Sequence, residues 1–288
     1  MNSLLKCLAD PIERHRNTTL NIFNKILKEI KIENKILIKT LILSIIDRLD
    51  HLPFPESSEE IRLKLVKLLE VLLADYKTEF KHVTAEVAKM IAVALKDAFP
   101  DMKQSLSKFI SNVSLNLKED IGPHTKQIVD SLCLNLKHQH NKIRKITVVA
   151  LTDLLLTDNA GICVDDCIPS LTLISTDKNL EVRKTFLTSI AKLIKGLNII
   201  YLKNDEAKLV YLLMSGVSDE KEEIQKMTLE LLEEVGNNRL KLALELKEDV
   251  EGLYKKCEGR KLQKIEGENK GGVEESKGNE EEKEEKDK

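Results

Sequence analysis

The stretch "STDKNLEVRKTFLTSIAKLI" (residues 175–194) decides the fold, because its pattern recurs along the chain. In it, Asp177 precedes Arg183 by six positions, and an apolar run with helical spacing follows the arginine. The other pairs with this spacing, the last two keeping only half of the pattern, are Asp10 with Arg16, Glu56 with Arg62, Asp97 with Lys103, His138 with Arg144, and Asp219 with Gln225. The second members of the six pairs are separated by 46, 41, 41, 39 and 42 residues. A period near 40 residues predicts an array of paired helices.

The apolar residues follow the same period. Seven positions after each basic position the chain has Phe23, Leu69, Ile110, Leu151, Ile190 and Leu232. Ten positions after it the chain has Ile26, Leu72, Val113, Leu154, Leu193 and Val235. Residues three and seven positions apart lie on one face of a helix, so each unit presents an apolar seam to its neighbours.

Each unit is therefore predicted to be an outer helix, a short polar turn and an inner helix. The fold class that follows is all-α, an α-solenoid of stacked antiparallel helix pairs. We expect about six units within residues 1–236, the first one incomplete: 1–30, 34–76, 79–117, 122–157, 162–196 and 205–236. The second unit carries five extra residues, and the prolines of "HLPFPESS" (51–58) are the place where a lengthened turn is expected.

The acid in each turn and the basic residue that opens the next helix suggest a charged ladder. Asp177 and Asp219 suit a helix N-cap or a turn, because a carboxylate accepts backbone N–H bonds. Two pairings remain open, one within a unit and one between adjacent units. We expect solvent-exposed pairs worth about 0–1 kcal/mol each, which set the register between repeats while the leucine seams supply most of the stability.

Composition favours helix and offers no pointer to nucleic acid or membrane. The chain of 288 residues is 42% apolar, only 3% aromatic and without tryptophan, and its formal net charge is −2. The longest apolar run, "ILIKTLILSII" (36–46), is too short to span a membrane. The start of the chain does not have the layout of a signal peptide. We expect a soluble, cytoplasmic protein.

Five cysteines, Cys7, Cys133, Cys163, Cys167 and Cys257, are too few and too scattered for a disulfide framework. Cys163 and Cys167 in "CVDDC" lie one helical turn apart, so a redox or metal pair is one interpretation and helix packing is the other. Cys133, His138 and His140 can be imagined as zinc ligands, but no fourth ligand follows at a usual spacing. We expect no metal and no cofactor.

The two ends of the array differ from its middle. Only about nine residues precede the first turn. We therefore expect either a stub or a longer protein that has lost its front. Residues 237–257 are expected to form a capping helix, with Leu240, Leu244 and Leu253 facing the stack. Residues 258–288 carry eleven acids and eight bases with few aliphatic residues, which predicts a disordered Glu/Lys-rich tail, either solubilising or an electrostatic docking segment.

No catalytic constellation is present, since the chain has no phosphate-binding loop, nucleophile elbow or zinc-protease motif. Asp165 and Asp166 are adjacent in sequence and cannot form an acid–base pair across a cleft. The inner helices carry lysines that either solvate an exposed face or form a binding ridge on a concave surface for an acidic protein segment: Lys64, Lys67, Lys145, Lys184, Lys192, Lys195 and Lys226. Nucleic acid is disfavoured, because no aromatic residues alternate with these lysines.

With the repeat register set, the units resemble HEAT repeats, which have an acid in the turn and Val-Arg or Ile-Arg at the start of the second helix. Val182-Arg183, Ile143-Arg144 and Ile61-Arg62 match that pattern. Four strings further resemble the HEAT-repeat axonemal dynein assembly factors: "CLADPIERHRNTTLNIF" (7–23), "SSEEIRLKLVKLLEVLL" (57–73), "LKHQHNKIRKITVVALTDLL" (136–155) and "PSLTLISTDKNLEVRK" (169–184). The resemblance covers roughly residues 5–236.

The resemblance implies a non-enzymatic cytoplasmic scaffold for the preassembly of ciliary dynein arms. Its expected partners are proteins, namely axonemal dynein chains and other assembly factors or chaperones, with no small molecule, nucleic acid or membrane. The rival function for such an array is an adaptor for nuclear transport or a phosphatase scaffold. A third interpretation is a fragment with no role of its own.

Overall fold

In the computed structural model, two layers of helices run along residues 1–235. The structure describes residues 2–157, 163–197, 199–248 and 250–252. Residues Met1–Val235 form one unit, and the rest of the chain, from Gly236, falls in a second. The described residues contain helices and turns and no strand, so the all-α solenoid predicted from the repeats is confirmed.

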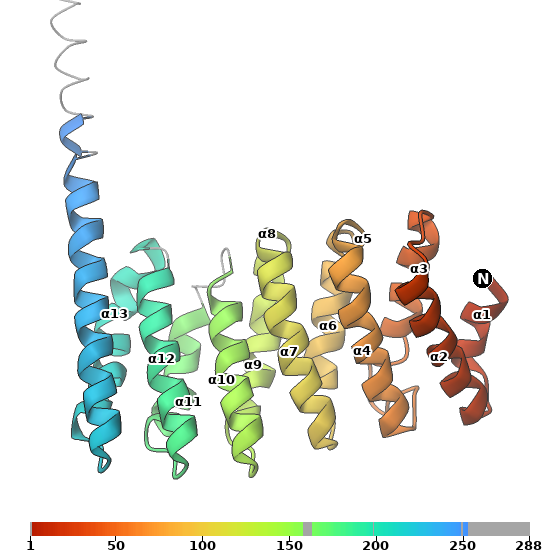
Figure 1. Cartoon of the computed structure of the whole chain (residues 1–288), viewed down its shortest axis with the longest axis horizontal. Helices are drawn as coiled ribbons and strands as arrows, with labels where there is room; N and C mark the ends of the chain where they lie inside the picture. Colours follow the sequence, from red (N-terminus) through yellow and green to blue (C-terminus); the bar gives the residue numbers. More distant parts are fainter. Residues whose placement is uncertain (1, 158–162, 198, 249, 253–288) are drawn as a thin grey trace, which may run out of the picture. The chain divides into compact units, whose positions relative to one another are not determined.

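One layer holds the helix that opens with the basic residue of each repeat (Figure 1). We call these the second helices: α2 (Glu13–Glu29), α4 (Glu59–Asp75), α7 (Pro100–Asn116), α10 (Asn141–Leu155), α12 (Leu180–Gly196) and, up to the end of the first unit, residues 222–235 of an unlabelled helix. Within the first unit each packs against the next along the row, α2 on α4, α4 on α7, α7 on α10 and α10 on α12.

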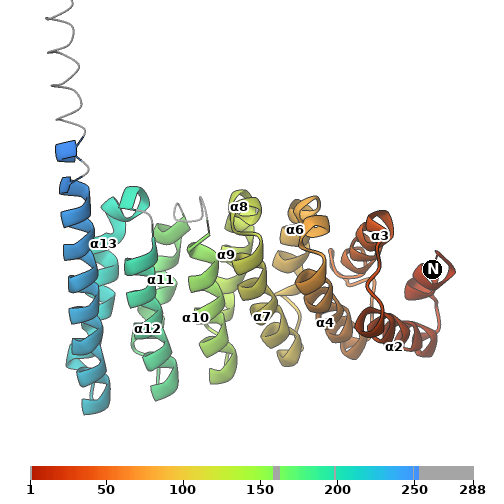
Figure 2. The same ribbon diagram turned by 45° about the horizontal axis from the view of Figure 1, so that its top comes forward.

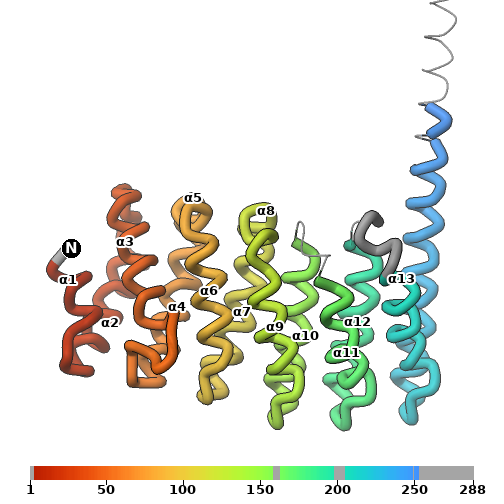
Figure 3. Tube along the Cα trace, turned by 180° about the vertical axis from the view of Figure 1, so that it is seen from behind, coloured from red at the N-terminus to blue at the C-terminus, as the bar shows by residue number. Residues whose placement is uncertain are grey.

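The other layer holds the first helices, which Figure 3 shows from behind. They are α1 (Asn2–Lys6) with the 3₁₀ turn η1 (Cys7–Ala9), α3 (Lys35–Ile46), α6 (Thr84–Ala94), α9 (Thr125–Asn135), α11 (Val164–Ser175) and α13 (Ile199–Met214) with η4 (Ser215–Ser218). Here α3 packs on α6, α6 on α9, α9 on α11 and α11 on α13. The tilted view of Figure 2 keeps the two layers in the same order.

Two repeats have a short extra helix that the two-helix prediction lacks. These are α5 (Lys77–Lys81), and α8 (Lys118–Ile121) followed by η2 (Gly122–His124). Each follows a second helix that ends at a residue with nearly the same backbone angles, Tyr76 at φ −129°, ψ 48° and Leu117 at φ −127°, ψ 39°. The repeated break turns the chain at the same place in both repeats.

Local sequence explains where several helices begin. Asn34 and Asn179 are N-caps whose side chains accept from the backbone N–H groups of Leu37 and Val182. Pro100 occupies the first turn of α7, where its missing N–H costs nothing. Asp177 accepts a bond within the turn instead of capping the helix, because Asn179 takes the cap position.

The predicted apolar seam forms the core. Phe23, Leu69, Ile110, Leu151 and Ile190 are all buried, and Leu232 is half-buried. A buried side chain of this size stabilises the fold by about 1.5–3 kcal/mol. The seam therefore supplies most of the attraction between successive repeats.

The last described helix of the chain begins before residue 237, the predicted start of a capping helix. One helix runs through residues 222–248, with Gly236 inside it, because a single helical glycine costs only about 1 kcal/mol and no proline follows. That residues 237–257 cap the array, with Leu240 and Leu244 facing it, stays a prediction. Leu253, the end of the predicted helix and the predicted tail at 258–288 lie outside the described residues.

The seam makes a direct stability prediction. Leu151 is 1% exposed on α10, so Leu151→Asp places a charge in the inter-repeat core and should cost on the order of 4 kcal/mol. The matched control is Leu134→Asp on α9, where the leucine is 64% exposed and the change should stay within about 0.5 kcal/mol. Urea unfolding followed by circular dichroism measures both, and equal midpoints for the two variants would contradict the assigned register.

Candidate functional site

Each acidic residue of the six-residue pattern organises its own turn. One carboxylate oxygen accepts the backbone N–H two residues later, at 2.8 Å for Asp10 to Ile12, 3.0 Å for Glu56 to Ser58, 2.9 Å for Asp97 to Phe99, 2.8 Å for Asp177 to Asn179 and 2.9 Å for Asp219 to Lys221. This bond satisfies a backbone donor between the two helices of a repeat. The turn therefore holds the carboxylate in a fixed position.

Four of these carboxylates, all but Asp10, also accept from the arginine of the preceding repeat. Nε and Nη2 of each guanidinium donate to the two carboxylate oxygens, at 2.7 and 2.8 Å for Arg16 on Glu56, 2.7 and 3.1 Å for Arg62 on Asp97, 2.6 and 2.8 Å for Arg144 on Asp177, and 2.7 and 3.0 Å for Arg183 on Asp219. Two parallel charge-assisted bonds fix the mutual orientation of the partners. Of the two pairings that the sequence left open, the carboxylates use the one between repeats.

The arginines also bind their own repeat, through the backbone. Nη1 donates to the carbonyl oxygen six residues earlier, from Arg16 to Asp10, Arg62 to Glu56, Arg144 to His138 and Arg183 to Asp177, at 2.8–3.0 Å. Gln225 makes the equivalent bond to Asp219 at 2.6 Å. A carbonyl needs no particular side chain, which explains why the spacing survives where the acid is replaced by His138 or the arginine by Gln225.

These pairs are buried or half-buried, which corrects the prediction of solvent-exposed pairs. The side chain of Glu56 is 0% exposed and that of Arg16 is 7% exposed. Burial raises the pKa of the Glu56 carboxyl, but bonds from Arg16, the Ser58 N–H and Arg48 outweigh it, and the pKa lies below its ordinary value.

Asp177 and Asp219 follow the same balance. Burial raises the pKa values of Asp177 and Asp219, and their arginine and backbone partners bring them below the ordinary value. Breaking a pair of this kind costs more than breaking a surface pair, because one charge stays buried without its partner.

The ladder changes composition at one junction. Lys103 was expected to continue it with Asp97, but its ammonium donates to the Leu95 carbonyl at 2.6 Å and to Asn135 Oδ1 at 2.7 Å. Asp97 is instead engaged by Arg62. The next turn has no acid, since His138 stands at that position. An arginine at position 103 would therefore find no carboxylate.

His138 still performs the turn role of the missing acid. Its Nδ1 accepts the backbone N–H of His140 at 3.1 Å, as the carboxylates do elsewhere. Burial, with the charges of Lys103, His140 and Arg144, lowers the pKa of His138 and so favours the neutral ring that can accept. Burial likewise lowers the pKa of Lys103.

Most lysines of the predicted ridge are bound to acids of the chain. The pairs are Lys145 with Glu181, Lys184 with Glu223, Lys192 with Asp153, Lys195 with Glu234, and Lys226 with Glu222. Lys64 donates to Asn17 Oδ1 at 2.6 Å, and Lys67 is exposed. The first four pairs join neighbouring second helices, so this row is a second set of bridges between repeats and not an open row of cations.

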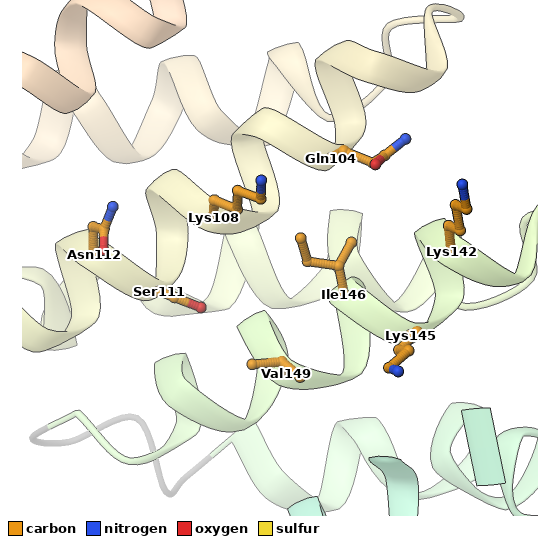
Figure 4. Close-up of a pocket in the computed structure, with 8 residues that line it drawn as sticks. All are labelled: Gln104, Lys108, Ser111, Asn112, Lys142, Lys145, Ile146 and Val149. Carbon is orange, nitrogen blue, oxygen red and sulfur yellow. The ribbon is translucent and has the colours of Figure 1, made fainter. Parts of the chain in front are cut away.

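A different basic surface lies between α7 and α10 (Figure 4). It is an open groove of about 560 Å³. Its lining residues are Gln104, Lys108, Ser111 and Asn112 from α7, and Lys142, Lys145, Ile146 and Val149 from α10. Sequence analysis singled out only Lys145 among them, because the groove depends on which side chains of two helices meet across 30 to 40 residues of chain.

The candidate metal ligands form no site in the described part of the chain, where no three His, Cys, Asp or Glu side chains are placed to hold an ion. Cys163 and Cys167 are buried thiols, and Cys133 is half-buried. Asp165 and Asp166 lie in the first turn of α11 and pair with Lys208 and Lys126. None of the described helices is long and apolar enough to cross a membrane.

The repeat array matches a family model along most of its length. The model described as "Dynein axonemal assembly factor 5-like, TPR repeats" matches residues 1–248. The chain belongs to the dynein axonemal assembly factor 5-like family. Tetratricopeptide repeats have about 34 residues. The spacing in this family member is nearer 40, which is typical of HEAT and armadillo repeats.

Three relatives carry the name dynein axonemal assembly factor 5. The protein of Xenopus laevis is 27% identical over 237 residues, covering 82% of this chain and 28% of the relative. That of Mus musculus is 26% identical over 184 residues, covering 64% and 21%, and that of Homo sapiens is 23% identical over 239 residues, covering 81% and 27%. The chain thus spans less than a third of the length of these relatives.

Solved armadillo arrays share the fold of this assembly factor family member. A designed armadillo repeat protein in complex with the peptide (KR)4 has a TM-score of 0.60 at 18% identity, covering 80% of this chain and 97% of that chain. A computationally designed armadillo repeat protein for modular peptide recognition has a TM-score of 0.58 at 18% identity, covering 80% and 98%.

We predict that two Asp→Asn substitutions lower the free energy of unfolding by different amounts, according to how buried each ion pair is. Asp177→Asn keeps the turn acceptor but removes the charge that faces Arg144, whose side chain is 16% exposed, so we expect a loss of about 2–4 kcal/mol in the free energy of unfolding. Asp166→Asn, in a pair whose side chains are 50% and 70% exposed, should cost about 0–1 kcal/mol. Urea midpoints that fall equally in both variants would show that burial of the ladder has no energetic consequence.

Proposed function

We propose that this chain is a non-enzymatic, protein-binding scaffold that acts in the cytoplasm during preassembly of axonemal dynein arms. The observation that carries the proposal is the family match over residues 1–248. The name shared by the three relatives supplies the process, the assembly of axonemal dynein. The proposed partners are axonemal dynein chains and other assembly factors or chaperones.

The architecture supports a binding role. Each second helix is tied by Arg–carboxylate bonds to the turn before the next one and by bridges such as Lys192 to Asp153, so their outer faces are held in fixed register. A surface of fixed spacing suits the recognition of a long segment of another protein, because the surface loses little conformational entropy on binding. The guanidinium and carboxylate groups of the ladder bond to one another. This supports a role as a scaffold over a role as an enzyme.

Removal of the protein from a ciliated cell tests the proposal. We expect cilia of normal number that lack dynein arms in electron micrographs and do not beat. The intact chain, tagged and precipitated from the cytoplasm of the same cells, should recover axonemal dynein heavy or intermediate chains. The matched control is Leu151→Asp, which should reduce this capture because it destabilises the core between repeats.

Normal arms after removal would contradict the proposal. So would recovery of a small GTPase or a phosphatase catalytic subunit in place of dynein chains, since that result supports an adaptor for nuclear transport or phosphatase scaffolding.

A further inference from the structure

The groove between α7 and α10 differs in charge from the rest of the second-helix surface. Lys108, Lys142 and Lys145 line it, and no acidic residue does. Among the described residues, Lys108 and Lys142 have no carboxylate within ion-pair distance, whereas Lys145 turns away from α7 and binds Glu181 (Figure 4). Burial raises the pKa of Glu70 on α4, and the positive charge of Lys108 lowers it in part, without an ion pair between the two. Because neither Lys108 nor Lys142 is held by a carboxylate, both cations are available to an external anion.

The groove also has an apolar part. The Ile146 side chain points into the space between the two helices (Figure 4), and Val149, one helical turn after Lys145, is 38% exposed. Together they offer an apolar contact to a side chain of a ligand. Such a contact favours a partner that brings apolar groups as well as charge.

Neutral polar groups on α7 complete the surface. Gln104, Ser111 and Asn112 line the same groove. Amide and hydroxyl groups can both donate and accept, so they suit the N–H and C=O groups of an extended backbone. No aromatic residue lines the groove, which disfavours a base-stacking ligand such as single-stranded nucleic acid.

We propose that the α7–α10 groove binds an extended acidic segment of a partner protein, in which aspartate or glutamate residues alternate with aliphatic ones. The carboxylates pair with Lys108 and Lys142, and an aliphatic side chain packs on Ile146 and Val149. This inference rests on the proposed function, since it gives the scaffold one of its contact points. The attraction is electrostatic at the rim, so it speeds association and weakens as salt rises.

The test uses the purified chain and a fluorescein-labelled peptide of alternating glutamate and leucine. A lysine–leucine peptide of equal length is the charge-reversed probe. Fluorescence anisotropy should show saturable, salt-sensitive binding of the acidic peptide alone. The double variant Lys108→Glu/Lys142→Glu should weaken this binding about tenfold or more.

Two further variants make the result specific to the groove. Lys96→Glu/Lys137→Glu carries the same charge change at exposed lysines in inter-helix turns, and it should bind the acidic peptide as the unaltered chain does. Val149→Ser keeps every charge and should still weaken binding, because it removes an apolar contact without disturbing the core.

Four results would overturn the inference: no binding of the acidic peptide, equal binding of the lysine–leucine peptide, equal weakening by the two lysine pairs, or full binding by Lys108→Glu/Lys142→Glu. The assay contains no dynein. A failure to capture dynein chains from cells would therefore leave a positive peptide result standing, and a negative peptide result would leave the dynein proposal standing.

Discussion

Every junction of the array that carries an arginine depends on one guanidinium that donates to two turns at once. Its Nη1 holds a carbonyl of its own repeat, and its Nε and Nη2 hold the carboxylate of the next repeat. That carboxylate in turn accepts the N–H that closes its own turn. Because each member is tied on two sides, a repeat cannot slide along its neighbour without breaking several charge-assisted bonds. The aliphatic seams supply attraction between repeats, and these bonds define which residues meet.

The same logic explains the one irregular junction. Lys103 and His138 both depart from the pattern of the other repeats. The Lys103 ammonium donates to a backbone carbonyl and to Asn135. The His138 ring accepts the N–H of its own turn, as a carboxylate does elsewhere. Lys103 is on α7 and His138 is just before α10, and these two helices line the groove in which Lys108 and Lys142 make no ion pair with a described residue. On α10 and α12, by contrast, Lys145, Lys184, Lys192 and Lys195 are bound to acids on the neighbouring second helix. That part of the surface neutralises itself, whereas Lys108 and Lys142 at the α7–α10 groove make no ion pair with a described residue.

The fold could be predicted from the sequence because the patterns that indicate it lie within single helices or recur at a fixed period. The seam residues from Phe23 to Ile190 follow from helical spacing within one helix, and the repeat period follows from counting. The sequence does not indicate how buried the Arg–carboxylate pairs are or which repeat supplies each partner. The spacing between Asp177 and Arg183 is the same whether the acid pairs within its own repeat or with Arg144 of the repeat before it. The short helices α5 and α8 have five and four residues, too few to show a period. The groove was missed because it depends on the absence of acids around Lys108 and Lys142, which only the packing of two helices reveals.

The central claim is that the turn carboxylates are held ionised by the arginines of the preceding repeat. Carbon-13 NMR titration of the carboxyl groups of Glu56, Asp177 and Asp219 tests it most directly. The account predicts pKa values below those of an unfolded chain, about 3.9 for Asp and 4.3 for Glu. The pairs then contribute their full stabilisation above about pH 4, and this contribution is lost as the pH falls through the lowered values. Titration of all three groups at or above the unfolded-chain values would contradict the account.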